Sequence, residues 1–96
     1  MLDRVQLREI QNKAEAGDVE AMYELSKALR YFHDRSYEEN IYYWLSRAAD
    51  MGHMDAQFDY GIELAKTGQG SCIEYIKAAA AQGHEKALKI LEKMGQ

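Results

Sequence analysis

The stretch WLSRAADMGHMDAQFDY, residues 44–60, returns 31 positions further on as YIKAAAAQGHEKALKIL, residues 75–91. Both copies carry paired alanines, then a glycine, a histidine directly after it, and an alanine three positions after the histidine. A fainter copy lies 35 positions earlier, where the places of Leu45, Ala49, Gly52, Ala56 and Tyr60 are taken by Ile10, Ala14, Gly17, Ala21 and Leu25. A repeat of about 30–35 residues indicates a stack of helical hairpins.

The composition favours one folded, all-α domain over residues 1–96. Hydrophobic residues make up 47% of the chain and charged residues 29%, which is typical of a globular protein and not of a disordered one. The chain contains no proline, and it is rich in residues that form helices readily. We therefore expect a short α-solenoid of about six antiparallel helices.

The charge and the N-terminal residues exclude several classes of partner. A net charge of −4 and a pI near 5.3 argue against nucleic-acid binding, which needs a dense basic surface. The chain opens without an apolar signal core, and no apolar run is long enough to cross a bilayer. A single cysteine cannot form an internal disulfide, which favours a reducing compartment. We expect a cytoplasmic protein that binds neither nucleic acid nor membrane.

Capping residues and glycines predict where the helices begin and end. Asp3 with Gln6, Ser36 with Glu39 and Ser71 with Glu74 have the spacing of a capping box. Asp18 is expected to cap the second helix, and Gly17, Gly52 and Gly83 to end helices, while residues 67–70 form a turn. The chain then divides into an N-terminal capping helix (1–17), two repeats (18–52 and 53–83) and a C-terminal capping helix (84–96).

The hydrophobic spacing also predicts the buried faces of the six helices. The expected core residues are Leu7, Ile10, Ala14, Ala21, Leu25, Ala28, Leu29, Phe32, Ile41, Trp44, Leu45, Ala48, Ala49, Ala56, Tyr60, Leu64, Ile73, Ile76, Ala79, Ala80, Ala87, Leu88, Leu91 and Met94.

The pattern Trp44, Ala48-Ala49, Gly52, Ala56, Tyr60-Gly61 resembles the Sel-one-like repeat, a helix-pair relative of the tetratricopeptide repeat. The resemblance extends from about Ile10 to Leu91, and it implies that small residues such as Gly61 and Ser26 let helices approach closely. At the two ends Glu9, Lys13 and Glu92 replace expected apolar or small residues, as polar caps do. Secreted relatives carry paired cysteines, and this chain has none.

No arrangement of residues points to an enzyme, a cofactor or a metal. His53 and His84 occupy equivalent places in successive repeats, which puts them roughly 10 Å apart, too far to share a zinc ion. We interpret them as helix-start residues near exposed backbone N–H groups. Cys72 has no histidine beside it in the sequence to activate it as a nucleophile.

The resemblance places the most interesting surface on the concave side, because the first helix of each tetratricopeptide-like pair lines a groove. The expected groove residues are Tyr23, Lys27, Arg30, Tyr31, Phe58, Ile62, Lys66, Lys86, Lys89 and Lys93. Aromatic rings give contact area at low entropic cost, and cations select an acidic segment or a terminal carboxylate. This predicts a protein or peptide partner, although Lys86, Lys89 and Lys93 have equally the spacing of a solvated stripe.

Two other hypotheses fit the sequence. In the first, the protein is a small acidic inhibitor or regulator that blocks a basic site on its target with a convex surface formed by Glu20, Glu24, Glu38, Glu39, Asp50, Asp55, Asp59 and Glu63. In the second, it is a structural protein that associates with itself through a poorly capped end, at Leu2 with Val5 or at Leu88 with Met94. In general we expect the chain to be a monomer or a weak dimer. The aromatic cluster Tyr37, Tyr42 and Tyr43 fits either internal packing or a second contact surface.

Overall fold

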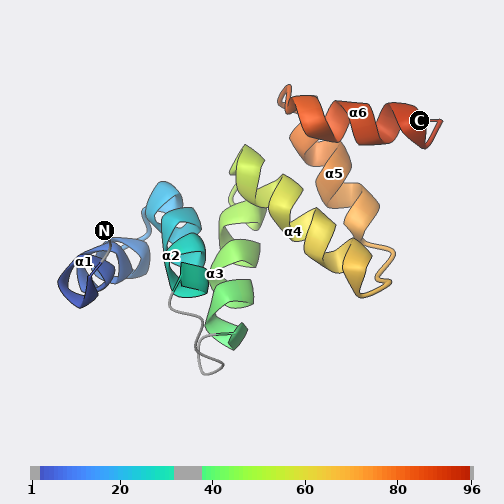
Figure 1. Ribbon diagram of the computed structural model, residues 1–96. Helices are drawn as coiled ribbons and strands as arrows, with labels where there is room; N and C mark the ends of the chain where they lie inside the picture. The colour runs from blue at the N-terminus through green and yellow to red at the C-terminus, as the bar shows by residue number, and fades with distance from the viewer. Residues whose placement is uncertain (1–2, 32–37, 96) are drawn as a thin grey trace.

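Six α-helices follow one another along the chain in the computed structural model, which describes residues 3–31 and 38–95 (Figure 1). They are α1 (Arg4–Glu15), α2 (Val19–Tyr31), α3 (Glu38–Asp50), α4 (Met54–Lys66), α5 (Cys72–Ala81) and α6 (Glu85–Lys93). The all-α prediction is therefore confirmed. The predictions that involve Leu2, Phe32, Ser36, Tyr37 and the side chains of Glu38 and Glu39 lie outside the described residues.

Three of the turns share one geometry, and each contains a glycine of the repeat. Gly17, Gly52 and Gly83 have φ values of 101°, 97° and 95°. In the α3–α4 turn the Gly52 N–H donates to the carbonyl of Ala49, and the His53 N–H donates to that of Ala48, both at 3.0 Å. This left-handed helix ending suits glycine, which has no Cβ to clash. The three glycines end helices, as the sequence predicts.

The capping predictions are partly correct. Asp3 and Gln6 form the reciprocal capping box of α1, and the Asp18 carboxylate accepts the Ala21 N–H at the start of α2. The capping box predicted at Ser71 is wrong. Ser71 has φ −65° and ψ −10°, and its hydroxyl caps no N–H group. A capping residue normally has an extended backbone, whereas Ser71 already turns with the helix.

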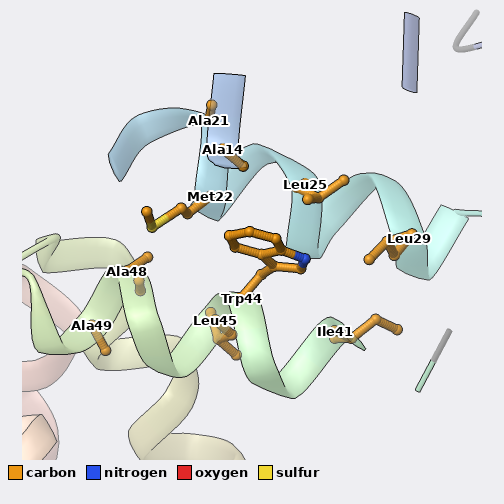
Figure 2. Packing of buried hydrophobic residues seen from close by; sticks show 11 residues of the cluster. Ala14, Ala21, Met22, Leu25, Leu29, Ile41, Trp44, Leu45, Ala48 and Ala49 are labelled. Atoms are coloured by element: carbon orange, nitrogen blue, oxygen red, sulfur yellow. The ribbon is translucent and has the colours of Figure 1, made fainter. Parts of the chain in front are cut away.

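The core consists of two clusters of buried side chains. The larger one joins α1, α2, α3 and the start of α4, and the smaller one is formed by Ile76, Ala79, Ala80 and Ala87 of α5 and α6. Figure 2 shows the indole of Trp44 rising from α3 towards α2, beside Met22 and Leu25. Met22 is fully buried, although the sequence pattern did not single it out.

The predicted inward positions of Leu88 and Met94 are wrong. Their exposed fractions are 48% and 55%. The equivalent faces of α2 and α4 are covered by α3 and α5, the helices that follow them in the chain. In the part of the chain that the structure describes, no helix follows α6, so the same face remains open to solvent.

The molecule is elongated, as a stack of hairpins should be. Its principal extents are 45 × 25 × 22 Å, with a Cα radius of gyration of 13.9 Å. A compact chain of this length would have a radius of gyration of about 12.5 Å. Among the described residues, no helix is long and apolar enough to cross a bilayer.

Candidate functional site

His53 makes three contacts, and two of them join its repeat to the preceding one. Its Nδ1 atom accepts the Ala56 N–H at 3.1 Å and so caps α4. Its Nε2 atom lies 2.8 Å from a carboxylate oxygen of Glu20, and its ring lies against that of Tyr23 with centroids 4.5 Å apart. Because Nδ1 accepts a hydrogen bond, the ring proton must be on Nε2, where it donates to Glu20.

His84 repeats this arrangement one hairpin later. Its Nδ1 atom accepts the Ala87 N–H at 3.2 Å. Its Nε2 atom lies 3.4 Å from Asp55, and its ring stacks on Phe58 with centroids 4.3 Å apart. Asp55 and Phe58 occupy the same repeat positions as Glu20 and Tyr23. Both histidines are therefore helix-start residues, as predicted.

These contacts change the interpretation of Tyr23 and Phe58, which we expected to face a free groove. Both rings are partly buried and packed against the core clusters. The Tyr23 hydroxyl also donates to Asp59 at 2.7 Å. Burial, together with this hydrogen bond to a carboxylate, raises the pKa of Tyr23 well above its ordinary value. The two aromatic rings hold consecutive repeats together, which is a task that a comparison of single helices cannot reveal.

Between α2 and α4 lies a hollow of about 250 Å³, which we call the α2–α4 hollow. It is lined by Lys27, Arg30, Phe58, Asp59, Ile62 and Glu63. Arg30 pairs with Glu63 at 3.2 Å, and Lys66 lies 3.7 Å from the same carboxylate. The prediction that Asp59 and Glu63 belong to a separate convex face is thus wrong, because both line the same hollow as Lys27 and Arg30.

The other predicted groove residues do not line this hollow. Tyr31 is 55% exposed near the end of α2. Lys86, Lys89 and Lys93 are exposed on α6. Lys86 and Lys89 take the repeat positions that Asp55 and Phe58 use to contact His84. These two lysines therefore lie on the face of α6 that, in α4, contacts the next repeat. The continuous basic groove predicted from the sequence is therefore wrong. Four of its residues line the α2–α4 hollow, and the two cations among them, Lys27 and Arg30, are matched there by Asp59 and Glu63.

A larger hollow of about 590 Å³, which we call the α1–α3 hollow, lies between α1 and α3, with α2 contributing to its floor. Its apolar floor is formed by Leu7, Leu25, Leu29 and Trp44, and the rest of its lining by Arg4, Val5, Arg8, Gln11, Glu15 and Tyr43. The sequence reasoning missed this site. Arg4 and Arg8, one helical turn apart beside the apolar face of α1, were the available signal.

The same hollow recurs one repeat later between α3 and α5, with a volume of about 410 Å³, and we call it the α3–α5 hollow. Asp50, Tyr60, Leu64, Glu74 and Tyr75 line it at the repeat positions of Glu15, Leu25, Leu29, Tyr43 and Trp44. Its floor is more polar, because the Tyr75 hydroxyl donates to Asp50 at 2.7 Å. Among the described residues that line it there are two carboxylates and no cation.

Among the described residues, no group of three or more side chains is placed to hold a metal ion. Cys72 is a free, half-buried thiol. Comparison with protein-family models, curated proteins and solved structures finds no match for this chain.

Proposed function

We propose that this chain is a non-enzymatic binding module that receives a segment of a partner protein in the α1–α3 hollow. The observation that carries the proposal is an apolar floor, including Trp44, beside Arg4 and Arg8. A volume of about 590 Å³ is within the usual range of ligand sites, about 300–1,000 Å³. Val5 and Tyr43, which are 68% and 51% exposed, extend the apolar surface to the rim, which suits a polypeptide.

The aromatic wall of the hollow, on α3, is held in place by contacts within the chain. The rings of Tyr43 and Trp44 meet edge to face with centroids 5.0 Å apart. The Arg47 guanidinium lies 5.5 Å and 5.4 Å from the centroids of these two rings, and it also donates to the Tyr43 hydroxyl. A surface that is already ordered loses little conformational entropy on binding, which favours affinity.

The α2–α4 hollow, which contains four of the ten groove residues predicted from the sequence, offers less to a partner. Its volume is smaller, and its Arg30 already has a carboxylate partner within the molecule. The acidic-inhibitor hypothesis meets a similar difficulty. Five of the six carboxylates that the structure describes contact other side chains of the chain, namely Glu20, Asp50, Asp55, Asp59 and Glu63. Each of these contacts would compete with a basic target.

The single tryptophan provides a direct test, because Trp44 lines the α1–α3 hollow and neither of the other two. Peptides would be selected from a random displayed library against the full chain, synthesised, and titrated while the Trp44 emission is recorded. We expect a saturable change in emission. Affinity should fall at least about tenfold in Val5→Asp and Tyr43→Ala, since each removes about 1.4 kcal/mol or more of contact.

Lys27→Glu, in the α2–α4 hollow, and Lys66→Glu, beside Glu63 of that hollow, serve as controls, and circular dichroism checks that every variant folds. We expect both controls to bind as the parent does. Peptides that bind without changing the Trp44 emission, and lose affinity in Lys27→Glu, would move the site to the α2–α4 hollow. A selection that yields no binding peptide would contradict the proposed function.

A further inference from the structure

The α1–α3 hollow carries the opposite charge to the molecule as a whole. The chain has a net charge of −4, yet the described residues that line the hollow include two arginines and one carboxylate. Among the side chains that the structure describes, neither Arg4 nor Arg8 forms an ion pair. The carboxylate, Glu15, accepts a hydrogen bond from Gln11 at 3.2 Å. Two guanidinium groups therefore stand beside an apolar floor with no anionic partner among the described residues.

The α3–α5 hollow shows that this charge does not follow from the repeat itself. It has the same place in the stack and a related floor, but its lining includes Asp50 and Glu74 and, among the described residues, no cation. Stacking the hairpins therefore creates the hollow, and the sequence of α1 gives it a positive rim. Two hollows of one architecture and opposite charge should select different ligands, because electrostatic complementarity sets specificity.

We propose that the α1–α3 hollow binds an acidic peptide segment in which carboxylates lie next to a large apolar side chain. This inference rests on the proposed function and names its partner class. Arginine pairs with carboxylates through two parallel hydrogen bonds, which fixes both distance and orientation. The apolar side chain occupies the floor at Leu25, Leu29 and Trp44, where it loses its contact with water.

The spacing of the arginines limits the ligand further. Residues four apart in a helix are separated by about 6 Å along its axis. In an extended peptide, residues i and i+2 are separated by about 6.6 Å and lie on one side of the chain. The ligand that fits both arginines is therefore an extended segment with acidic residues at alternate positions and an apolar residue between or beside them.

Long polyanions fit this surface less well than a short peptide. Nucleic acids and anionic membranes present many charges over a wide area, and they would also meet the acidic residues elsewhere on the molecule. A short segment contacts the positive rim alone. Anionic vesicles and a single-stranded oligonucleotide are therefore included among the probes, and we expect neither to change the Trp44 emission.

The test compares two synthetic peptides that differ only in charge. Both contain two leucines, with either two glutamates or two glutamines at alternate positions, and both are titrated against the full chain while the Trp44 emission is recorded. We expect the glutamate peptide to bind at least about tenfold more tightly, which corresponds to about 1.4 kcal/mol. The advantage should shrink between about 0.05 M and about 0.5 M salt, as the Debye length falls.

A pair of matched variants separates local charge from total charge. Arg8→Glu and Lys27→Glu change the net charge equally, but Lys27 lines the α2–α4 hollow. We expect Arg8→Glu to weaken the glutamate peptide at least about tenfold and to favour a lysine version, since reversing one charge reverses the preference. Lys27→Glu should bind as the parent does.

Equal affinities for the glutamate and glutamine peptides, or library-selected peptides without acidic residues that still shift the Trp44 emission, would overturn the acidic assignment and leave the binding function standing. Equal losses in Arg8→Glu and Lys27→Glu would also overturn it, because net charge would then explain the effect. If no peptide, selected or synthetic, shifts the Trp44 emission, the proposed function itself is wrong.

Discussion

Histidine can cap a helix only through a ring nitrogen that carries no proton. His53 and His84 meet this condition at Nδ1, and each gives its Nε2 side to a carboxylate of the preceding repeat. Asp18 performs the same capping task in the first repeat with a carboxylate, which is a more common cap. The histidines add what aspartate cannot, a flat ring for an aromatic neighbour from the preceding repeat.

Two substitutions at residue 53 separate the contribution of the helix cap to stability from that of the ring contacts. His53→Ala removes the acceptor and the ring, and we expect it to lower the free energy of unfolding by about 1–2 kcal/mol. His53→Asn keeps an acceptor for the Ala56 N–H, so it should lose about half as much. Urea denaturation measures both. If His53→Asn is as unstable as His53→Ala, the contacts with Tyr23 and Glu20 matter and the cap does not.

The raised pKa of Tyr75 predicts that the folded chain loses stability at alkaline pH. Its hydrogen bond to Asp50, and then its partial burial, raise the pKa of Tyr75 to about 12. In the unfolded chain a tyrosine ionises at about 10. The folded state thus favours the neutral phenol, because a phenolate would lose the bond that it donates to Asp50 and face a like charge. The contribution is complete below about pH 10 and is lost as the pH rises towards about 12.

Urea denaturation between about pH 8 and about pH 12 should therefore show stability falling through this window. Tyr75→Phe, which has no hydroxyl to ionise, should show a smaller fall than the parent chain. The contribution of Tyr23, whose pKa is also raised, remains in this variant. Identical pH profiles for the parent and Tyr75→Phe would contradict the role assigned to the Tyr75–Asp50 hydrogen bond.

At the scale of the helices, α4 and α5 pack closely because Gly61 has no side chain. A Cβ atom at residue 61 would lie 2.8 Å from Ile76 Cδ1 and 3.2 Å from the Cys72 carbonyl oxygen. Ser26, at the same position of the preceding repeat, is also buried and turns its hydroxyl back to the Tyr23 carbonyl at 2.6 Å. Small residues therefore mark the line along which the helices of a hairpin meet.

Gly61→Ala should lower the free energy of unfolding by about 1 kcal/mol, because overpacking costs about 1–3 kcal/mol and alanine returns up to about 1 kcal/mol as a better helix former. Combining it with Ile76→Val should cost less than the sum of the two single changes, since the shorter side chain makes room. Gly70→Ala is the control, with no atom within 4 Å of the added Cβ. Additive losses would contradict the predicted contact.

Apart from the capping box at Ser71, the features that depend on neighbours along the chain are predicted correctly from the sequence. The glycine turns, the capping box at Asp3 and the capping histidines each involve residues within about one or two helical turns. Whether a given side chain is buried also depends on helices that are distant in the sequence, and at some positions the burial was therefore predicted wrongly. Met22 and Leu88 occupy equivalent positions, yet Met22 is buried and Leu88 is 48% exposed, because only α2 is followed by a covering helix in the described chain.

The candidate sites were harder to predict for the same reason. Whether Tyr23 faces a partner or the next repeat depends on His53, which lies 30 residues further on. The α1–α3 hollow depends on how α1 sits beside α3, across an intervening helix. A repeat pattern gives the order of helices in the stack. It does not give the side-chain contacts between one hairpin and the next.

At the scale of the whole molecule, the two core clusters are unequal and share two helices, α4 and α5. In α5, Tyr75 packs against the larger cluster, while Ile76, Ala79 and Ala80 belong to the smaller one. Ala56 and Tyr60 of α4 belong to or pack against the larger cluster, while Met54, Phe58 and Ile62 of the same helix pack against the smaller one. Opening the smaller cluster leaves α1 to α4 packed together. Opening the larger cluster removes the support of α4, and with it one wall of the smaller cluster.

This asymmetry predicts the order in which the helices open. In a stack of repeats each hairpin is held mainly by its neighbours, so the end with the smaller core should open first. Native-state hydrogen exchange should therefore show faster exchange in α5 and α6 than in α2 and α3. Ile76→Ala, which removes about 2–5 kcal/mol of packing, should speed exchange in α5 and α6 at least about tenfold and leave α2 and α3 nearly unchanged.

Leu45→Ala is the matched change in the larger cluster, where Leu45 is 1% exposed. Because the smaller cluster depends on α4, we expect this variant to speed exchange in all six helices and not in the first four alone. Equal exchange rates along the parent chain, or a response to Ile76→Ala that spreads evenly into α2 and α3, would show that the stack opens as a single unit. Two linked clusters would then be the wrong description of its stability.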